Sequence, residues 1–169
     1  NSMAKSILDV IDHLGINKFH LLGHSMGGMI VQEMTKLAGD KVEKLICYGT
    51  GPRGNMPERF ETIDQSRDRL KIEGLTNTAH RIAKTWFVKE DKAKHFDLCS
   101  KAGKLATLEA ADFALVAMKN WDGLENLKNI KNKTLIIWGN KDRAYNRNQV
   151  DTLNEKITYS NLIIFEGCS

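Results

Sequence analysis

The sequence has few cysteines and no long apolar run. Its three cysteines, Cys47, Cys99 and Cys168, are far apart, odd in number and without a Cys-x-x-Cys pair, which argues against a disulfide framework and against a zinc site. No apolar run of about 18 residues is present, so we expect no membrane-spanning helix. The chain also opens without the basic and apolar segments of a signal peptide. We therefore expect a cytoplasmic protein with reduced thiols, no bound metal and no membrane partner.

The sequence also has little excess of one sign of charge over the other. The 25 basic and 21 acidic side chains leave a net charge of +4, and the whole surplus lies between residues 52 and 133. Acids are interleaved with bases there, which is typical of a solvated helical surface, with recruitment of an anionic substrate as the alternative. No basic stripe carries interleaved aromatic residues, so we expect no binding to nucleic acid. The length of 169 residues allows one hydrophobic core.

Residues 23–27 are the most informative stretch, and they read Gly-His-Ser-Met-Gly. The apolar run 19–22 before them predicts a buried strand, and the helical spacing of apolar side chains over 26–37 predicts a helix. This strand–turn–helix context predicts that Ser25 is held on a sharp turn as a nucleophile. We expect a Cβ to be crowded out at both motif glycines, and Gly28 to let the helix pack closely on the sheet. An ordinary glycine-rich turn is the alternative.

The hydrophobic pattern divides the chain into three parts. In residues 1–51, a core part, the pattern predicts a helix at 3–14, a strand at 19–22, a helix at 26–37 and a strand at 45–48. Residues 52–133 predict helices alone, at 57–73, 78–87, 91–102 and 108–120. Residues 134–169, a second core part, predict strand, helix and strand at 134–138, 148–157 and 162–165. The fold class is therefore α/β, a parallel sheet with crossover helices and an inserted all-helical lid.

An acidic residue follows the strand predicted at 134–138. Asp142 ends the segment Gly-Asn-Lys-Asp that begins at Gly139. Because reactive groups gather at the carboxyl ends of parallel strands, Ser25 and Asp142 are expected at one edge of the sheet, as parts of one site. The alternative is that Asp142 caps the turn that follows it.

A base for the serine is missing from the expected place, since no histidine follows His95. His24 is adjacent to Ser25 on a tight turn, so we expect its ring to point elsewhere and to serve in packing or support. His80 and His95 are expected on the lid surface, with contact to a substrate as the alternative. We expect five large side chains to lie in the core of the lid, and the alternative is that they form part of the wall of the substrate site: Trp86, Phe87, Phe113, Met118 and Trp121.

Taken in order, these motifs resemble the α/β-hydrolase family, in the branch with a helical lid between the sixth and seventh strands. The serine turn, the lid, the strand with Gly139 to Asp142 and the closing residues 165–169 all match, over essentially the whole chain. The resemblance implies that Ser25 is the nucleophile and Asp142 the acid of a Ser-His-Asp triad. It implies that the backbone N–H of Met26 is one donor of the oxyanion hole.

The same resemblance places the triad histidine just beyond Ser169 and the second oxyanion donor before the first helix. We therefore expect an internal piece of a longer hydrolase that is inactive by itself. If the piece exists alone, the strand at 19–22 is expected to lose a sheet neighbour and to expose an apolar edge.

The implied reaction is hydrolysis of a small carboxylic ester, a lactone or a C–C bond through an acyl-enzyme, with a small-molecule substrate and no cofactor. The helix at 108–120 and the Trp-Asp-Gly-Leu that follows it resemble the lids of enol-lactonases and of hydrolases that cut C–C bonds. Haloalkane dehalogenases are disfavoured because they carry aspartate where Ser25 stands, whereas haloperoxidase-like and acyltransferase members stay open. The alternative from another class is a small-molecule receptor without catalysis.

Overall fold

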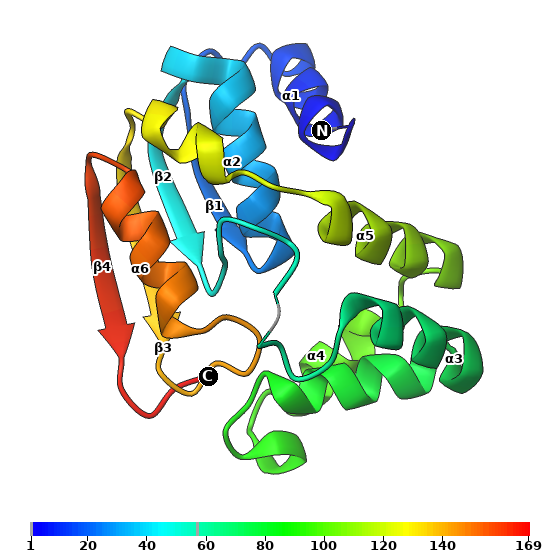
Figure 1. Ribbon diagram of the computed structural model, residues 1–169. Coiled ribbons are helices and arrows are strands. Elements are labelled where there is room, and N and C mark those ends of the chain that lie inside the picture. Colours follow the sequence, from blue (N-terminus) through cyan, green and yellow to red (C-terminus); the bar gives the residue numbers. More distant parts are fainter. Residues whose placement is uncertain (1, 57) are drawn as a thin grey trace.

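The computed structural model describes residues 2–56 and 58–169, and it is built around a parallel sheet of four strands (Figure 1). The strands lie in the order β1-β2-β3-β4 and are all parallel. They are β1 (Phe19–His24), β2 (Val42–Tyr48), β3 (Lys133–Gly139) and β4 (Ser160–Phe165). Parallel neighbours require crossover connections, and helices supply them here. The predicted α/β class with a parallel sheet is confirmed.

Helices α2 (Met26–Ala38) and α6 (Arg147–Lys156) pack on the sheet, and α1 (Ser2–His13) packs on α2. The short 3-10 helix at Gly39–Lys41 links α2 to β2. Helix α6 begins with a capping box, in which the Asn146 side chain accepts from the Gln149 backbone and the Gln149 side chain accepts from the Asn146 backbone. The core between sheet and helices contains Met34, Leu45, Ile136 and Val150, all nearly inaccessible to solvent.

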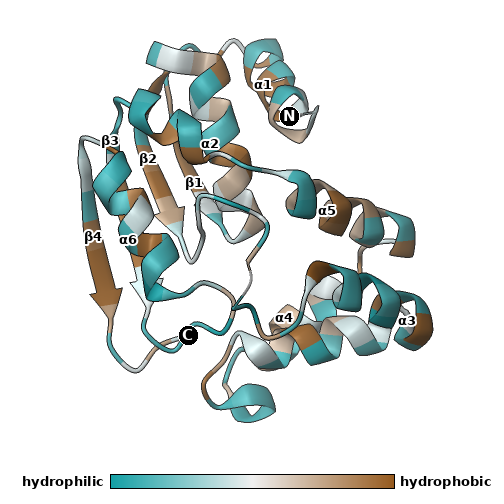
Figure 2. Cartoon of the chain, in the orientation of Figure 1, coloured by the Kyte–Doolittle hydropathy of each residue, from teal (hydrophilic) through white to brown (hydrophobic). Residues whose placement is uncertain are grey.

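The side chains that point to the other face of the sheet are much more exposed. On β1, Leu21 is buried while its neighbour Leu22 is 63% exposed. Tyr48, Ile163 and Phe165 are also exposed, although Figure 2 shows strongly apolar colour along β4. The expectation of an apolar edge at residues 19–22 agrees with this arrangement, because β1 lies at one end of the strand order.

Between β2 and β3 lies the helical block, which we define as residues 63–121 and which contains α3 (Ile63–Thr85), α4 (Phe96–Gly103) and α5 (Leu108–Asn120). Short 3-10 helices lie at Glu90–Lys92 and Leu124–Asn129. Within the described part of residues 52–132, the only β pairing is an isolated bridge between Arg53 and Asp122. No helix in the described ranges is long and apolar enough to cross a membrane.

Two predicted helix starts in this block are wrong. The helix predicted at 57–73 begins only at Ile63, because Thr62 and Gln65 form a capping box there; Pro57 itself lies outside the described residues. The helix predicted at 78–87 belongs to the same element, α3, but the break predicted between the two helices is present at Gly74, whose φ of 73° and ψ of 169° are not helical. The helix predicted at 91–102 begins at Phe96 instead.

Candidate active site

Ser25 occupies the turn between β1 and α2 with a backbone conformation that is rare for a residue with a side chain. Its φ of 52° and ψ of −122° lie on the positive-φ side of the Ramachandran map. The turn is fixed by hydrogen bonds on both sides of the residue. The Ser25 N–H donates to the Tyr48 carbonyl at 3.1 Å, and the Ser25 carbonyl accepts from the Thr50 hydroxyl at 2.7 Å. Such surrounding bonds are what keeps a strained residue in place.

The glycines around Ser25 differ in how much space surrounds them. A Cβ on Gly23 would lie 2.2 Å from the Gly27 carbonyl oxygen, and one on Gly28 would lie 2.4 Å from the Thr50 hydroxyl oxygen. A Cβ on Gly27 would meet nothing within 4 Å. The expected crowding is therefore confirmed at Gly23 and Gly28 and is wrong at Gly27, whose Cβ position points away from the packed side of the turn.

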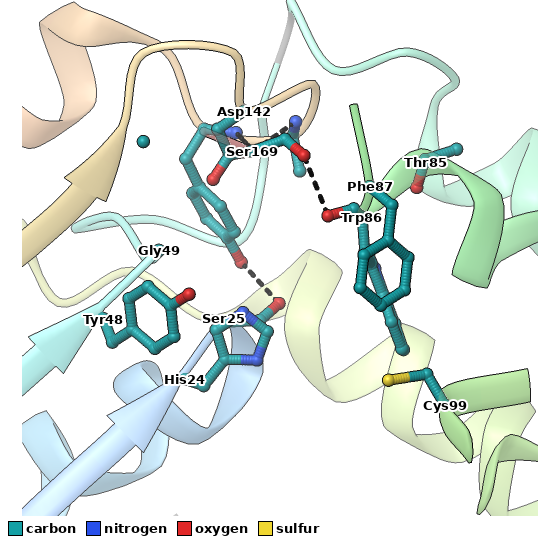
Figure 3. A pocket seen from close by; sticks show the side chains of 13 residues that line it. His24, Ser25, Tyr48, Gly49, Thr85, Trp86, Phe87, Cys99, Asp142 and Ser169 are labelled. Atoms are coloured by element: carbon teal, nitrogen blue, oxygen red, sulfur yellow. Dashed lines mark hydrogen bonds between the residues drawn. The ribbon is translucent and has the colours of Figure 1, made fainter. Parts of the chain in front are cut away.

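A cavity of about 240 Å³ lies at the carboxyl ends of the strands (Figure 3). Ser25 and Asp142 both line it, as their positions after β1 and β3 predict. The helical block contributes Trp86 and Cys99 to the wall, and Ser169 closes another side. The cavity therefore lies between the sheet edge and the helical block, with the predicted serine and acid in one space.

The two oxygens of Asp142 have different surroundings. Oδ1 accepts from the backbone N–H groups of Ala144 at 2.7 Å and Tyr145 at 3.0 Å, so the turn-capping alternative holds for this oxygen. Oδ2 has no hydrogen-bond partner within the described ranges. It lies 3.5 Å from the position that a Cβ on Gly49 would take, and the His24 ring lies equally close to that point. One oxygen builds the turn while the other is left to accept a donor.

His24 lines the same cavity, although we expected its ring to point elsewhere. The ring packs against Tyr48, with centroids 4.9 Å apart. Burial lowers the pKa of the His24 imidazole, and this outweighs the nearby Asp142 carboxylate, which acts to raise it. Among the hydrogen bonds of the described residues, none joins His24 to Ser25 or Asp142. The neutral imidazole is thus in the site without being paired to the serine.

Tyr145 is the residue of the site that the sequence analysis missed. Its hydroxyl lies 3.2 Å from the Ser25 Oγ, and either atom can donate. Its backbone carbonyl accepts from the Trp138 indole N–H at 2.8 Å, which ties the residue to β3. Burial raises the pKa of the Tyr145 phenol to about 12, so the phenol is neutral at physiological pH. The only signal in the sequence was a tyrosine three residues after the predicted acid.

The large side chains of the helical block divide between the core and the cavity wall. Trp86 and Phe87 line the cavity, and Phe113 is 69% exposed, so the expectation of lid core is wrong for these three. Trp86 and Phe87 follow the end of α3, where the chain passes the strand ends. Met118 is buried and Trp121 is half-buried, with its indole N–H donating to Glu33 at 3.1 Å, as expected of core residues.

The remaining predicted residues lie as follows. Met26 is the first residue of α2, and backbone N–H groups in a first helical turn have no partner within the helix. Its N–H is therefore open to an external acceptor beside Ser25. His80 and His95 are exposed, as expected, and neither lines the cavity. The His80 ring contacts Phe96 edge-on at 5.0 Å instead.

A family model described as the α/β hydrolase fold matches residues 1–169. The chain belongs to the α/β hydrolase fold family. Among solved structures, this α/β hydrolase is similar to an esterase from Exiguobacterium antarcticum, with a TM-score of 0.86 and 25% identity over 97% of this chain and 64% of that one. It is also similar to the enol-lactonase from Burkholderia xenovorans LB400, with a TM-score of 0.88 and 19% identity over 99% of this chain and 64% of that one. The second likeness concerns the fold alone.

A curated relative of this α/β hydrolase is the 2-hydroxy-6-oxononadienedioate/2-hydroxy-6-oxononatrienedioate hydrolase of Escherichia coli. It is 30% identical over an alignment of 179 positions that covers 98% of this chain and 60% of the relative. Esterase YbfF of the same species is 39% identical over 62 residues, or 37% of this chain and 24% of the relative. The chain thus spans less than two thirds of the length of these relatives.

Proposed function

We propose that Ser25 is the nucleophile of a hydrolase that cleaves a small carboxylic ester, a lactone or a C–C bond beside a carbonyl group. The observation that carries the proposal is the positive φ of Ser25 on a strand-to-helix turn, with the side chain in a cavity that Asp142 shares. A non-glycine residue held in this conformation indicates a function that needs it. The esterase and the dienedioate hydrolase among the relatives support cleavage beside a carbonyl.

In this mechanism the Ser25 hydroxyl attacks the substrate carbonyl while an imidazole removes its proton. The C–O or C–C bond to the leaving group then breaks, the imidazolium returns the proton to that group, and the acyl-enzyme remains. The Met26 N–H donates to the oxyanion that develops. The Oδ2 atom of Asp142 accepts from the imidazole, orients it and stabilises its cationic form. Water then attacks the acyl-enzyme and releases the acid, and no cofactor takes part. The helical block serves as a lid that covers the substrate.

We assign the imidazole to a histidine joined to Ser169 in a longer polypeptide. Ser169 lines the cavity, and its hydroxyl donates to the Trp86 carbonyl at 2.9 Å. A residue attached to it would begin at the cavity wall, on the side where Asp142 lies. On this proposal the 169 residues alone bind substrate and do not turn it over. His24 is the competing base, because it lines the same cavity.

The test is covalent labelling of the full gene product by a fluorophosphonate. We expect stoichiometric labelling that Ser25→Ala abolishes and that the matched control Ser6→Ala, on the exposed side of α1, leaves unchanged. His24→Ala separates the two candidate bases, since labelling at an undiminished rate assigns the base elsewhere. A folded protein that fails to label but still binds small molecules would be the receptor of the alternative hypothesis.

A further inference from the structure

A second cavity, of about 390 Å³, lies inside the helical block. Its wall is apolar over most of its area, with Leu70, Ile82 and Leu115 on α3 and α5. It borders the candidate active site, because Trp86 and Cys99 line both cavities. Met26, the candidate oxyanion donor, lines the second cavity too. A substrate whose carbonyl is at Ser25 can therefore extend its apolar part into this space.

Arg59 is the one charged side chain among the described residues that line this cavity. Its Nη1 donates to the Glu61 carbonyl at 2.7 Å and to the Ser66 hydroxyl at 2.9 Å, and both acceptors are uncharged. Within residues 2–56 and 58–169, Nε and Nη2 have no hydrogen-bond partner, and Arg59 makes no salt bridge. The guanidinium carbon lies 4.3 Å from the centroid of the Phe60 ring, so one face of the cation is covered while part of its set of N–H donors is unused.

The nearest carboxylates are already neutralised by other arginines. The Glu61 carboxylate lies 3.0 Å from Arg81 and 3.4 Å from Arg69, and it accepts from the Ser66 hydroxyl at 2.6 Å. Glu73 pairs with the same two arginines. Two acids therefore pair with two bases, and among the described residues Arg59 has no carboxylate within salt-bridge distance. Burial lowers the pKa of the Arg59 guanidinium, although the Glu61 carboxylate acts to raise it, and arginine remains protonated in proteins.

The position of Arg59 connects the second cavity to the serine. The guanidinium acts on the pKa of the Tyr145 phenol, whose hydroxyl contacts Ser25. The backbone N–H of Phe60, the next residue, donates to the Arg143 carbonyl in the loop that carries Asp142. Arg59, which lines the second cavity, is therefore held next to the loop that carries Asp142.

We propose that the substrate is an amphiphilic carboxylate, whose apolar body fills the second cavity and whose carboxylate binds Arg59. A planar guanidinium with open N–H donors in low-dielectric surroundings favours a carboxylate over a neutral group. The proposal deepens the proposed function, since it assigns the carboxylate to the molecule that Ser25 attacks. The surplus of positive charge in residues 52–133 includes this arginine.

The test is calorimetric binding of two probes of equal size, 4-phenylbutyrate and 4-phenylbutanamide, to the full gene product. We expect the carboxylate to bind on the order of tenfold more tightly than the amide, as charge-assisted hydrogen bonds allow. Arg59→Met removes this preference, whereas Lys101→Met, which removes one charge from the exposed side of α4, retains it. Arg59→Lys is measured as well, because it keeps the charge and separates loss of binding from loss of folding.

Two results would overturn the proposal: equal affinity for both probes in the unchanged chain, or a carboxylate preference that survives in a folded Arg59→Met variant. Binding does not depend on the nucleophile, so fluorophosphonate labelling of the full gene product is scored separately. If the protein is labelled normally but does not prefer the carboxylate probe, only the proposed carboxylate site at Arg59 is wrong. Preference for the carboxylate without labelling defeats the serine mechanism alone.

Discussion

At the scale of single residues, the glycines around Ser25 differ in what they tolerate. A methyl group on Gly23 would overlap the Gly27 carbonyl and the Val31 side chain, whereas one on Gly27 has open space around it. We expect Gly23→Ala to destabilise the chain by about 3 kcal/mol, from overpacking against rigid backbone. Gly27→Ala, the matched control in the first turn of α2, is expected to be neutral or stabilising by up to about 1 kcal/mol. Urea unfolding of both variants measures the difference, and equal midpoints would contradict the prediction.

The raised pKa of the Tyr145 phenol predicts a loss of folding stability that is confined to alkaline pH. Its pKa of about 12 in the folded chain lies above the ordinary value of 10.0. Below pH 10 the phenol is neutral in both states, so its contribution to stability is fully present. As pH rises from 10 to 12 the unfolded state ionises first, and up to about 3 kcal/mol of stability is lost. Unfolding curves at several pH values test this, with Tyr145→Phe losing less stability over the same window.

Asp142 combines a structural oxygen with an unpaired one, and an amide can separate the two roles. Asn at this position can still accept from the N–H groups of Ala144 and Tyr145, so Asp142→Asn is expected to fold normally. In the full gene product its turnover should fall roughly 10³- to 10⁴-fold, because the proposed mechanism then lacks the charge that orients and stabilises the imidazolium. Asp142→Ala loses the turn contacts as well and should also be less stable. Near-normal turnover in the folded Asn variant would remove Asp142 from the mechanism.

At the scale of elements, α3 is held by a cluster of charges on its two halves. Glu61 lies before the helix and binds Arg81, while Glu73 joins Arg81 to Arg69 across the kink at Gly74. Burial acts to raise the pKa of the Glu61 carboxyl, but hydrogen bonds from Ser66 and Arg81 outweigh it and lower the pKa. The cluster therefore joins two helical halves that Gly74 interrupts.

We expect Glu61→Gln to destabilise the chain by about 2 kcal/mol, since its charged hydrogen bonds are lost. Because the folded pKa lies below the ordinary 4.5, the carboxylate contributes stability above that pH and loses it as the solution becomes more acidic. Glu125→Gln is the control, because that side chain is 89% exposed and should change stability by at most about 0.5 kcal/mol. Unfolding at pH 7 and pH 3 tests both, and the two variants should differ much less at pH 3.

At the scale of the whole molecule, the sheet has one packed face and one face with exposed apolar side chains. Leu22, Ile163 and Phe165 point to the second face and are each at least 45% exposed. Contiguous exposed apolar surface of this kind favours association. We expect the 169-residue chain to self-associate and Leu22→Lys with Ile163→Lys to reduce association, measured by sedimentation velocity. Leu105→Lys is the control, because Leu105 is 87% exposed in the helical block and should leave association unchanged.

The sequence alone determined the alternation of strands and helices, because hydrophobic periodicity is a local property. It also located Ser25 and Asp142 at the ends of β1 and β3, since parallel strands bring their carboxyl ends to one edge. Helix starts in the block were missed where a cap such as Thr62 overrides the apolar pattern.

Only the tertiary structure decided what surrounds the serine. The contact of Tyr145 with Ser25 joins residues 120 positions apart. The conformation of one loop decides that one oxygen of Asp142 accepts hydrogen bonds within the turn while the other stays unpaired. Arg59 likewise has no salt bridge among the described residues because Glu61 and Glu73 pair with other arginines across the fold. Distances between residues far apart in the chain are set by packing, and neither composition nor spacing encodes them.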